Sequence, residues 1–136
     1  MKSPIPFAIL LAGCASSAQV ERVEPLGGGY DAAIIAEPSS SSFESVGHFQ
    51  YLRKDGRKIT NIGAHDASPD GRYISYQEGS SARIFIIHKE SGSIRAVTTA
   101  SPGLVREFNW SKEAGYLWLD IYDKDSIRLK IPEFRK

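Results

Sequence analysis

Apolar residues fall in short segments of strand length along most of the chain, and turn signals separate these segments. The two most apolar segments, 83–88 and 115–121, are rich in Ile, Leu, Tyr and Phe, as β-strands are. No stretch after the first 13 residues has the 3.6-residue period of an amphipathic helix. The turn signals are Lys54-Asp55-Gly56, Pro69-Asp70-Gly71, Glu90-Ser91-Gly92, Ser101-Pro102-Gly103, Glu113-Ala114-Gly115 and Asp123-Lys124-Asp125. The pattern predicts an all-β body of antiparallel strands over residues 30–136.

The segment 1–13 has a different pattern. It opens with Met1-Lys2 and continues as a short apolar stretch that ends in small residues before Cys14. This stretch is far shorter than the ~20 residues that a spanning helix requires. It therefore predicts an export signal that is removed from the mature protein. An ordinary secretory signal is the alternative to a lipoprotein signal.

The motif Leu11-Ala12-Gly13-Cys14 resembles the lipobox of bacterial lipoproteins. The resemblance implies diacylglycerol on the Cys14 sulfur, cleavage between Gly13 and Cys14, and a membrane anchor made by this covalent lipid. Cys14 is the single cysteine of the chain, so no intramolecular disulfide can form. By the family's sorting rule, Ala15 implies the periplasmic face of the outer membrane. No dissociable cofactor is expected.

Composition adds little beyond a single globular domain. Hydrophobic residues make up 41% of the 136-residue chain and charged residues 24%, which is an ordinary balance for a folded protein. Without Lys2, which leaves with the leader, 16 basic side chains face 16 acidic ones. A neutral chain lacks the basic surface that nucleic acid requires, so nucleic acid is not an expected partner. Residues 14–29 are rich in small residues and glycine and predict a flexible tether, and 38–42 predicts a loop.

The chain resembles itself when it is shifted by 43 residues. This shift places 68–76 on 111–119, so that Tyr73 falls on Tyr116 and Ile74 on Leu117. Farther along it places Ile84, Ile86 and His88 on Ile127, Leu129 and Ile131. These positions are therefore expected to keep the inward phase of the strand alternation. A repeat of about 40–45 residues is typical of four-stranded propeller blades.

The segment Ala67-Ser68-Pro69-Asp70-Gly71-Arg72-Tyr73-Ile74-Ser75-Tyr76, with the later Ile84-Phe85-Ile86-Ile87 and Val97-Thr98, resembles one blade of a TolB-type, WD40-like β-propeller. The second copy keeps Trp110-Ser111 but lacks the Pro, Asp and Gly of the turn, and 49–60 resembles the outer hairpin of an earlier blade. The resemblance implies two to three blade-like, four-stranded units. A closed propeller needs more than about 160 residues. An open stack, a sandwich or association with a partner is therefore expected.

The turn Ser68-Pro69-Asp70-Gly71 is predicted to be scaffold rather than catalytic. Pro69 presets φ, Asp70 bonds the neighbouring backbone, and Gly71 takes the position of positive φ. Trp110 and Trp118 are candidate contact residues. Both cannot be fully buried on one face if the strand turns between them, and an exposed tryptophan often marks an interface.

The remaining polar residues match no catalytic or metal-binding motif. The histidines lack the spacing of metal ligands, and the Asp-rich segment 120–125 lacks the glycine and distal glutamate of a calcium loop. No nucleophile motif is present. The histidines are His48, His65 and His88, and the aspartates are Asp120, Asp123 and Asp125. Neither catalysis nor a metal site is predicted.

These features favour a non-enzymatic envelope lipoprotein whose β-repeat module binds another envelope protein. One alternative is a periplasmic inhibitor or immunity lipoprotein directed against a cell-wall hydrolase, because small size and a lipid tether fit that role equally well. The other alternative is a shortened TolB-like propeller fragment that acts as an assembly partner.

Overall fold

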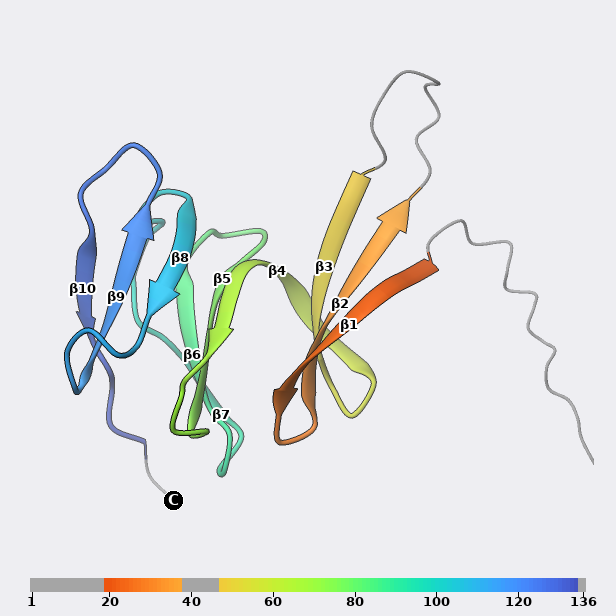
Figure 1. The fold of residues 1–136 in the computed structure, drawn as a ribbon, viewed down its shortest axis with the longest axis horizontal. Helices are drawn as coiled ribbons and strands as arrows, with labels where there is room; N and C mark the ends of the chain where they lie inside the picture. Colours follow the sequence, from red (N-terminus) through yellow and green to blue (C-terminus); the bar gives the residue numbers. More distant parts are fainter. Residues whose placement is uncertain (1–18, 38–46, 135–136) are drawn as a thin grey trace, which may run out of the picture.

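The computed structural model describes residues 19–37 and 47–134, which contain ten β-strands and no helix (Figure 1). Seven strands form one antiparallel sheet in chain order and three form a second sheet, with β9 in its centre. Neither sheet closes on itself. The strands are β1 (Gln19–Gly27), β2 (Tyr30–Glu37), β3 (Gly47–Lys54), β4 (Arg57–Ala67), β5 (Tyr73–Glu78), β6 (Ile84–His88), β7 (Ser93–Ala96), β8 (Val105–Asn109), β9 (Tyr116–Ile121) and β10 (Ile127–Lys130). The all-β prediction is confirmed.

Strand β4 divides the larger sheet into two units. Residues 57–62 pair with β3, whereas 65–67 pair with β5; Ile62 pairs with both neighbours, and the β4–β5 register shifts between Ile62 and His65. The first unit therefore comprises β1, β2, β3 and the first part of β4. The second unit comprises the last part of β4 with β5, β6 and β7, and the third comprises β8, β9 and β10 (Figure 1). The described residues thus confirm the expected blade-like units, although the third has three strands here. Within them no helix is long and apolar enough to cross a membrane.

Two apolar clusters fill the spaces between successive units, because side chains alternate between the two faces of each sheet. The second unit is consequently buried on both faces. Between the first and second units lie Leu26, Tyr30, Ala32, Leu52, Ile62, Ile74, Tyr76 and Ile87. Between the second and third lie Ile84, Ile86, Val105, Phe108, Leu117, Leu119 and Ile121. The core therefore consists of two apolar layers between stacked sheets rather than one central cluster.

The 43-residue spacing extends to all three units. Tyr30, Tyr73 and Tyr116 are the first residues of β2, β5 and β9. Each follows closely on a glycine with positive φ, as Gly71 (φ 78°) and Gly115 (φ 84°) show. The first unit is thus a full member of the repeat, which the sequence indicated only through its outer hairpin.

In the third strand of each unit, however, the expected correspondence is wrong. Tyr76 pairs with Phe85, whereas its counterpart Leu119 pairs with Ile127. Phe85, and not Ile84, is therefore the counterpart of Ile127. The third unit's hairpin is one residue shorter, and a slip of one residue moves a side chain to the other face of the sheet. As a result, the second unit turns Ile84 and Ile86 toward the third, whereas Ile127 and Leu129 point back toward the second. These four residues line one interface from opposite sides.

The predicted tether 14–29 is also wrong over most of its length. Residues 19–27 form β1, which pairs along β2, and Leu26 is buried. The following glycines make the hairpin turn instead of a linker, and Pro25 is tolerated because β1 is an edge strand. The β-domain therefore begins by residue 19 rather than at residue 30. Residues 14–18 and the predicted loop 38–42 lie outside the described residues.

Candidate functional site

The turn 68–71 has the geometry that its sequence predicts. Gly71 has a φ of 78°. The Oδ1 atom of Asp70 accepts hydrogen bonds from the Ser68 hydroxyl at 2.6 Å and from the Arg72 N–H at 3.0 Å. Ser68 Oγ in turn accepts a bond from the Tyr73 N–H at 2.9 Å. The bond from Ser68 also holds the pKa of Asp70 below its usual value. Both side chains thus hold the turn, which supports the structural interpretation.

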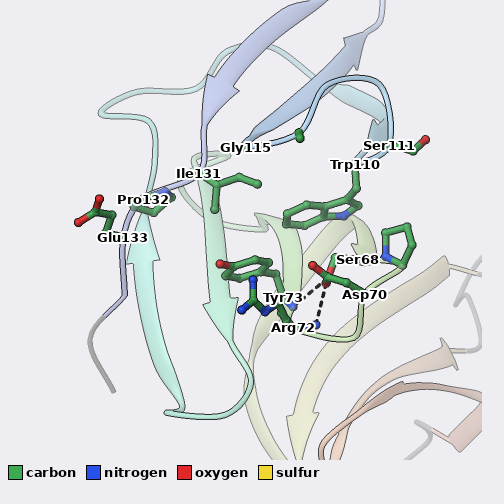
Figure 2. Close-up of a pocket in the computed structure, with 12 residues that line it drawn as sticks. Ser68, Asp70, Arg72, Tyr73, Trp110, Ser111, Gly115, Ile131, Pro132 and Glu133 are labelled. Atoms are coloured by element: carbon green, nitrogen blue, oxygen red, sulfur yellow. Dashed lines mark hydrogen bonds between the residues drawn. The ribbon is translucent and has the colours of Figure 1, made fainter.

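A cleft of about 590 Å³ lies beside this turn, between the second and third units (Figure 2). The rings of Tyr73 and Trp110 lie at its centre, with Ser68 and Asp70 on one side and Ile131 on another. Its volume falls within the range of small-ligand pockets. The segment 131–133, which follows β10, completes its lining.

Trp110 joins the second and third units rather than standing free. Its ring stacks on Tyr73 with the ring centres 5.7 Å apart and the planes 6° apart. Tyr73 also contacts His88 and Phe134, with ring centres 5.7 and 5.8 Å away. The Trp110 indole Nε1 is buried without a hydrogen-bond partner among the described residues. Trp110 therefore packs at an interface between units.

Trp118 lies on the opposite face of the third unit, which we call the end face. We define the end face by Tyr116, Trp118, Asp120, Arg128 and Lys130. Residues 117, 119 and 121 turn toward the second unit, so the alternating residues of β9 turn away from it.

Cations cover the aromatic rings of the end face. The Arg128 guanidinium lies 4.3 Å from the centre of the Tyr116 ring, and Lys112 Nζ lies 4.3 Å from that of Trp118. Arg128 also pairs with Glu113 at 3.2 Å. Such cation–π contacts are worth about 0.5–1 kcal/mol each at exposed sites.

The end face corresponds to the faces by which the first two units pack against their successors. Two residues after the tyrosine that begins the second strand of each unit lie Ala32, Ser75 and Trp118, and the first two are fully buried at 0% exposure. The residues that pair with these three positions are Leu52, Ile86 and Arg128. Leu52 and Ile86 are likewise 0% exposed. The third unit thus carries a tryptophan and an arginine where its sister units carry small and aliphatic residues.

A second, polar pocket of about 350 Å³ lies where β1, β4 and β8 approach one another. His65, whose side chain is 8% exposed, faces oxygen atoms with both ring nitrogens. Nδ1 is 3.0 Å from the Gly63 carbonyl and Nε2 is 3.1 Å from the Glu24 carboxylate. Burial raises the pKa of the adjacent Asp66. The His65 ring therefore links β1 to β4, and both of its nitrogens lie within hydrogen-bond distance of protein oxygen atoms.

The other candidates have local partners. His88 bonds the Ser91 hydroxyl at 2.8 Å, Asp120 pairs with Arg106, and Asp123 has a φ of 59° in its hairpin turn. Over residues 19–37 and 47–134, no group of three or more His, Cys, Asp or Glu side chains is placed to hold a metal ion. Gly13, Cys14 and the His48 side chain lie outside the described residues.

The described residues form an open, all-β stack of three repeat units, and within them no further sheet packs on the end face, where the Trp118 indole Nε1 is buried without a hydrogen-bond partner. No protein-family description, curated protein or solved structure matches the chain significantly.

Proposed function

We propose that this protein is a non-catalytic envelope lipoprotein, anchored through the lipidated Cys14, whose end face binds another envelope protein. The leader and the Leu11-Ala12-Gly13-Cys14 motif support the anchor and the outer-membrane, periplasmic location. The described residues support the binding role.

One observation carries the binding role: Trp118 replaces a small buried residue on the face that the sister units use for packing. A repeat unit with no further unit packed on it needs only a polar outer face to stay soluble. Charged or small polar residues would be sufficient for solubility. Solubility does not explain a half-buried tryptophan beside Tyr116 and Arg128. Tryptophan, tyrosine and arginine are the residue types that dominate binding energy at protein interfaces. The composition of the end face is therefore that of a contact surface.

Affinity capture with the tagged, membrane-extracted lipoprotein tests the proposal. We expect a specific envelope protein to be recovered and then to bind the purified lipoprotein directly. Trp118→Ala should weaken that binding by about 2 kcal/mol or more, as for a central aromatic contact. Ile94→Ala is the matched control, because Ile94 is 41% exposed on β7, outside the end face. Equal binding by both variants would contradict the assignment of the end face.

The anchor has its own test. Mass spectrometry of the mature amino terminus should find acyl chains on Cys14, and Cys14→Ala should release the protein from the membrane fraction. An unmodified cysteine in a soluble mature protein would favour an ordinary secretory signal instead.

A further inference from the structure

We infer that the free edge of β10 accepts an extended, acidic segment of the partner as the fourth strand of the third unit. This inference rests on the proposed function, because β10 contributes Arg128 and Lys130 to the end face. It adds a binding mode and the chemistry of the partner, which the end face alone does not specify.

Comparison with the second unit indicates that β10 lacks the second neighbouring strand that β6 has. In the second unit, β6 pairs with β5 on one side and with β7 on the other. In the third unit, β10 pairs with β9 alone among the described residues, and Figure 1 shows it at the outer margin of its sheet. Beyond β10 the chain turns back toward the second unit, where Phe134 stacks on His88 with ring centres 5.2 Å apart. Within residues 19–37 and 47–134, no strand therefore lies beside β10 at the position that β7 occupies in the second unit.

The backbone groups that face this opening can be identified. Ile131 N–H donates to the Gly115 carbonyl at 3.0 Å, in register with the β9–β10 pairing. Hydrogen-bonded pairs alternate along an antiparallel ladder, so Ile127 and Leu129 also direct their backbone groups to β9. Arg128 and Lys130 therefore turn their N–H and carbonyl groups to the free edge. Unpaired edge groups of this kind are the template for strand addition.

The side chains of β10 specify what the added strand would carry. Ile127 and Leu129 lie on the inner face but are only half-buried, whereas their neighbours Leu117 and Leu119 are 0% exposed. Aliphatic residues of an added strand would cover them. On the outer face, Arg128 and Lys130 project beside the edge, and no ion pair of Lys130 occurs within residues 19–37 and 47–134. Carboxylates on the added strand would lie opposite these cations and gain from the pairing.

The partner segment is therefore extended and alternates acidic with aliphatic residues. A second copy of this chain offers a less suitable strand. Among its edge strands, β7 carries Arg95, β8 carries Arg106 beside Glu107, and in β1 Arg22 separates Glu21 from Glu24, so each strand would bring a positive charge to Arg128 and Lys130. Like charges directly opposite each other on neighbouring strands are destabilising.

Titration of the full lipoprotein in detergent with two six-residue peptides tests this inference. One peptide alternates glutamate with valine and the other alternates lysine with valine. We expect the glutamate peptide to bind at least about tenfold more tightly and to slow hydrogen exchange of the Arg128 and Lys130 amides at least about tenfold. Methylating alternate backbone nitrogens of the glutamate peptide should abolish binding, because it removes the donors that pair with the edge. This control does not alter the protein.

Two variants at one position separate backbone from charge. Lys130→Pro removes the edge N–H but leaves the ladder to β9, and proline is tolerated on edge strands. It should weaken glutamate-peptide binding at least about tenfold. Lys130→Ala keeps the N–H and should weaken binding only about two- to threefold.

The outcomes distinguish this inference from the proposed function. Unchanged amide exchange with the glutamate peptide would overturn the inference, whatever the capture experiment yields. If the captured envelope protein binds Trp118→Ala weakly but binds Lys130→Pro normally, the binding role of the end face is supported and strand addition is contradicted. If Trp118→Ala captures the envelope protein as well as the unaltered lipoprotein does, and the glutamate peptide binds as expected, strand addition is supported and the binding role of the end face is contradicted. Dimers that dissociate on Lys130→Pro would assign the edge to a second copy and would also overturn the inference.

Discussion

The second and third units share their strand order, and their second strands begin 43 residues apart. They differ on the face that is turned away from the preceding unit. In the second unit this face carries Ser75 and Ile86, both fully buried against the third. In the third unit the same positions carry Trp118 and Arg128, which meet Lys112 and Tyr116 instead of another sheet. The comparison teaches that the third unit departs from the repeat at two paired positions that are fully buried in the second unit.

The difference has a simple steric basis. Packed sheets lie about 10 Å apart, so the centre of an interface accepts a serine or an alanine opposite larger side chains of the next sheet. A tryptophan at that position would hold the sheets apart. A sheet that packed on the end face would therefore have to lie farther from the third unit than packed sheets ordinarily lie from each other.

The largest expected effect comes from transferring the tryptophan into the internal interface. Ser75→Trp places a large ring at a position of 0% exposure. Overpacking of this size should cost about 3 kcal/mol or more and separate the second and third units. Urea unfolding followed by circular dichroism measures the loss. The reverse exchange, Trp118→Ser, should cost less, about 1–2 kcal/mol, because the ring is only partly buried and no sheet of the described residues packs on its outer side. Equal costs for the two exchanges would refute the distinction between the faces.

A smaller effect is expected from truncating the residues paired with these positions. Ile86→Ala leaves a cavity between two sheets and should lower the free energy of unfolding by about 2–5 kcal/mol. Arg128→Ala, at the equivalent position, removes an exposed ion pair and should cost about 1 kcal/mol or less. Both values come from chemical denaturation under the same conditions. A large loss for Arg128→Ala would mean that the end face stabilises the fold.

The turns that precede the second strands provide a third, smaller contrast. In the second unit the Ser68 hydroxyl joins Asp70 to the Tyr73 N–H, and Ser68 is 6% exposed. Ser68→Ala should therefore cost about 1–2 kcal/mol, because it leaves buried polar groups unpaired. Its counterpart Ser111 is exposed and bonds only Asn109 among the described residues, so Ser111→Ala should cost about 0.5 kcal/mol or less. Thermal unfolding of the two variants in parallel checks this order.

The sequence predicted the parts of the fold that depend on local pattern. Strand length, turn residues and the 43-residue repeat were sufficient for the all-β class, the blade-like units and the positive φ of Gly71. They were insufficient for β1, because Pro25 and the glycine run favour a linker until pairing with β2 is known. The hairpin after β9 is one residue short, and nothing local to that turn reveals the resulting slip.

The end face could have been found only by comparing all three units. Trp118 was a candidate contact residue from the sequence, but its meaning comes from Ala32 and Ser75 at the equivalent positions. The signal that aligns them is the spacing of Tyr30, Tyr73 and Tyr116, which is visible in the sequence once the first unit is recognised. The free backbone groups of β10 have no such signal, because edge position depends on which strands pair.

The smallest expected effect concerns acid. Glu78 ends β5 in the second unit, where hydrogen bonds from Ser81, Ser80 and Thr60 lower its pKa to about 2. The third unit has Ile121 at the equivalent position, so it lacks this carboxylate. A pKa that is lower in the folded state stabilises the protein fully above the ordinary value of 4.5, and this contribution is lost as the pH falls from there toward about 2. Glu78→Gln should flatten that part of the stability profile measured by urea unfolding between pH 6 and about pH 2. Glu90→Gln, on the exposed turn after β6, should leave the profile as it is in the unaltered protein. If Glu78→Gln also keeps the full acid-dependent loss, the carboxylate does not stabilise the end of β5 in solution.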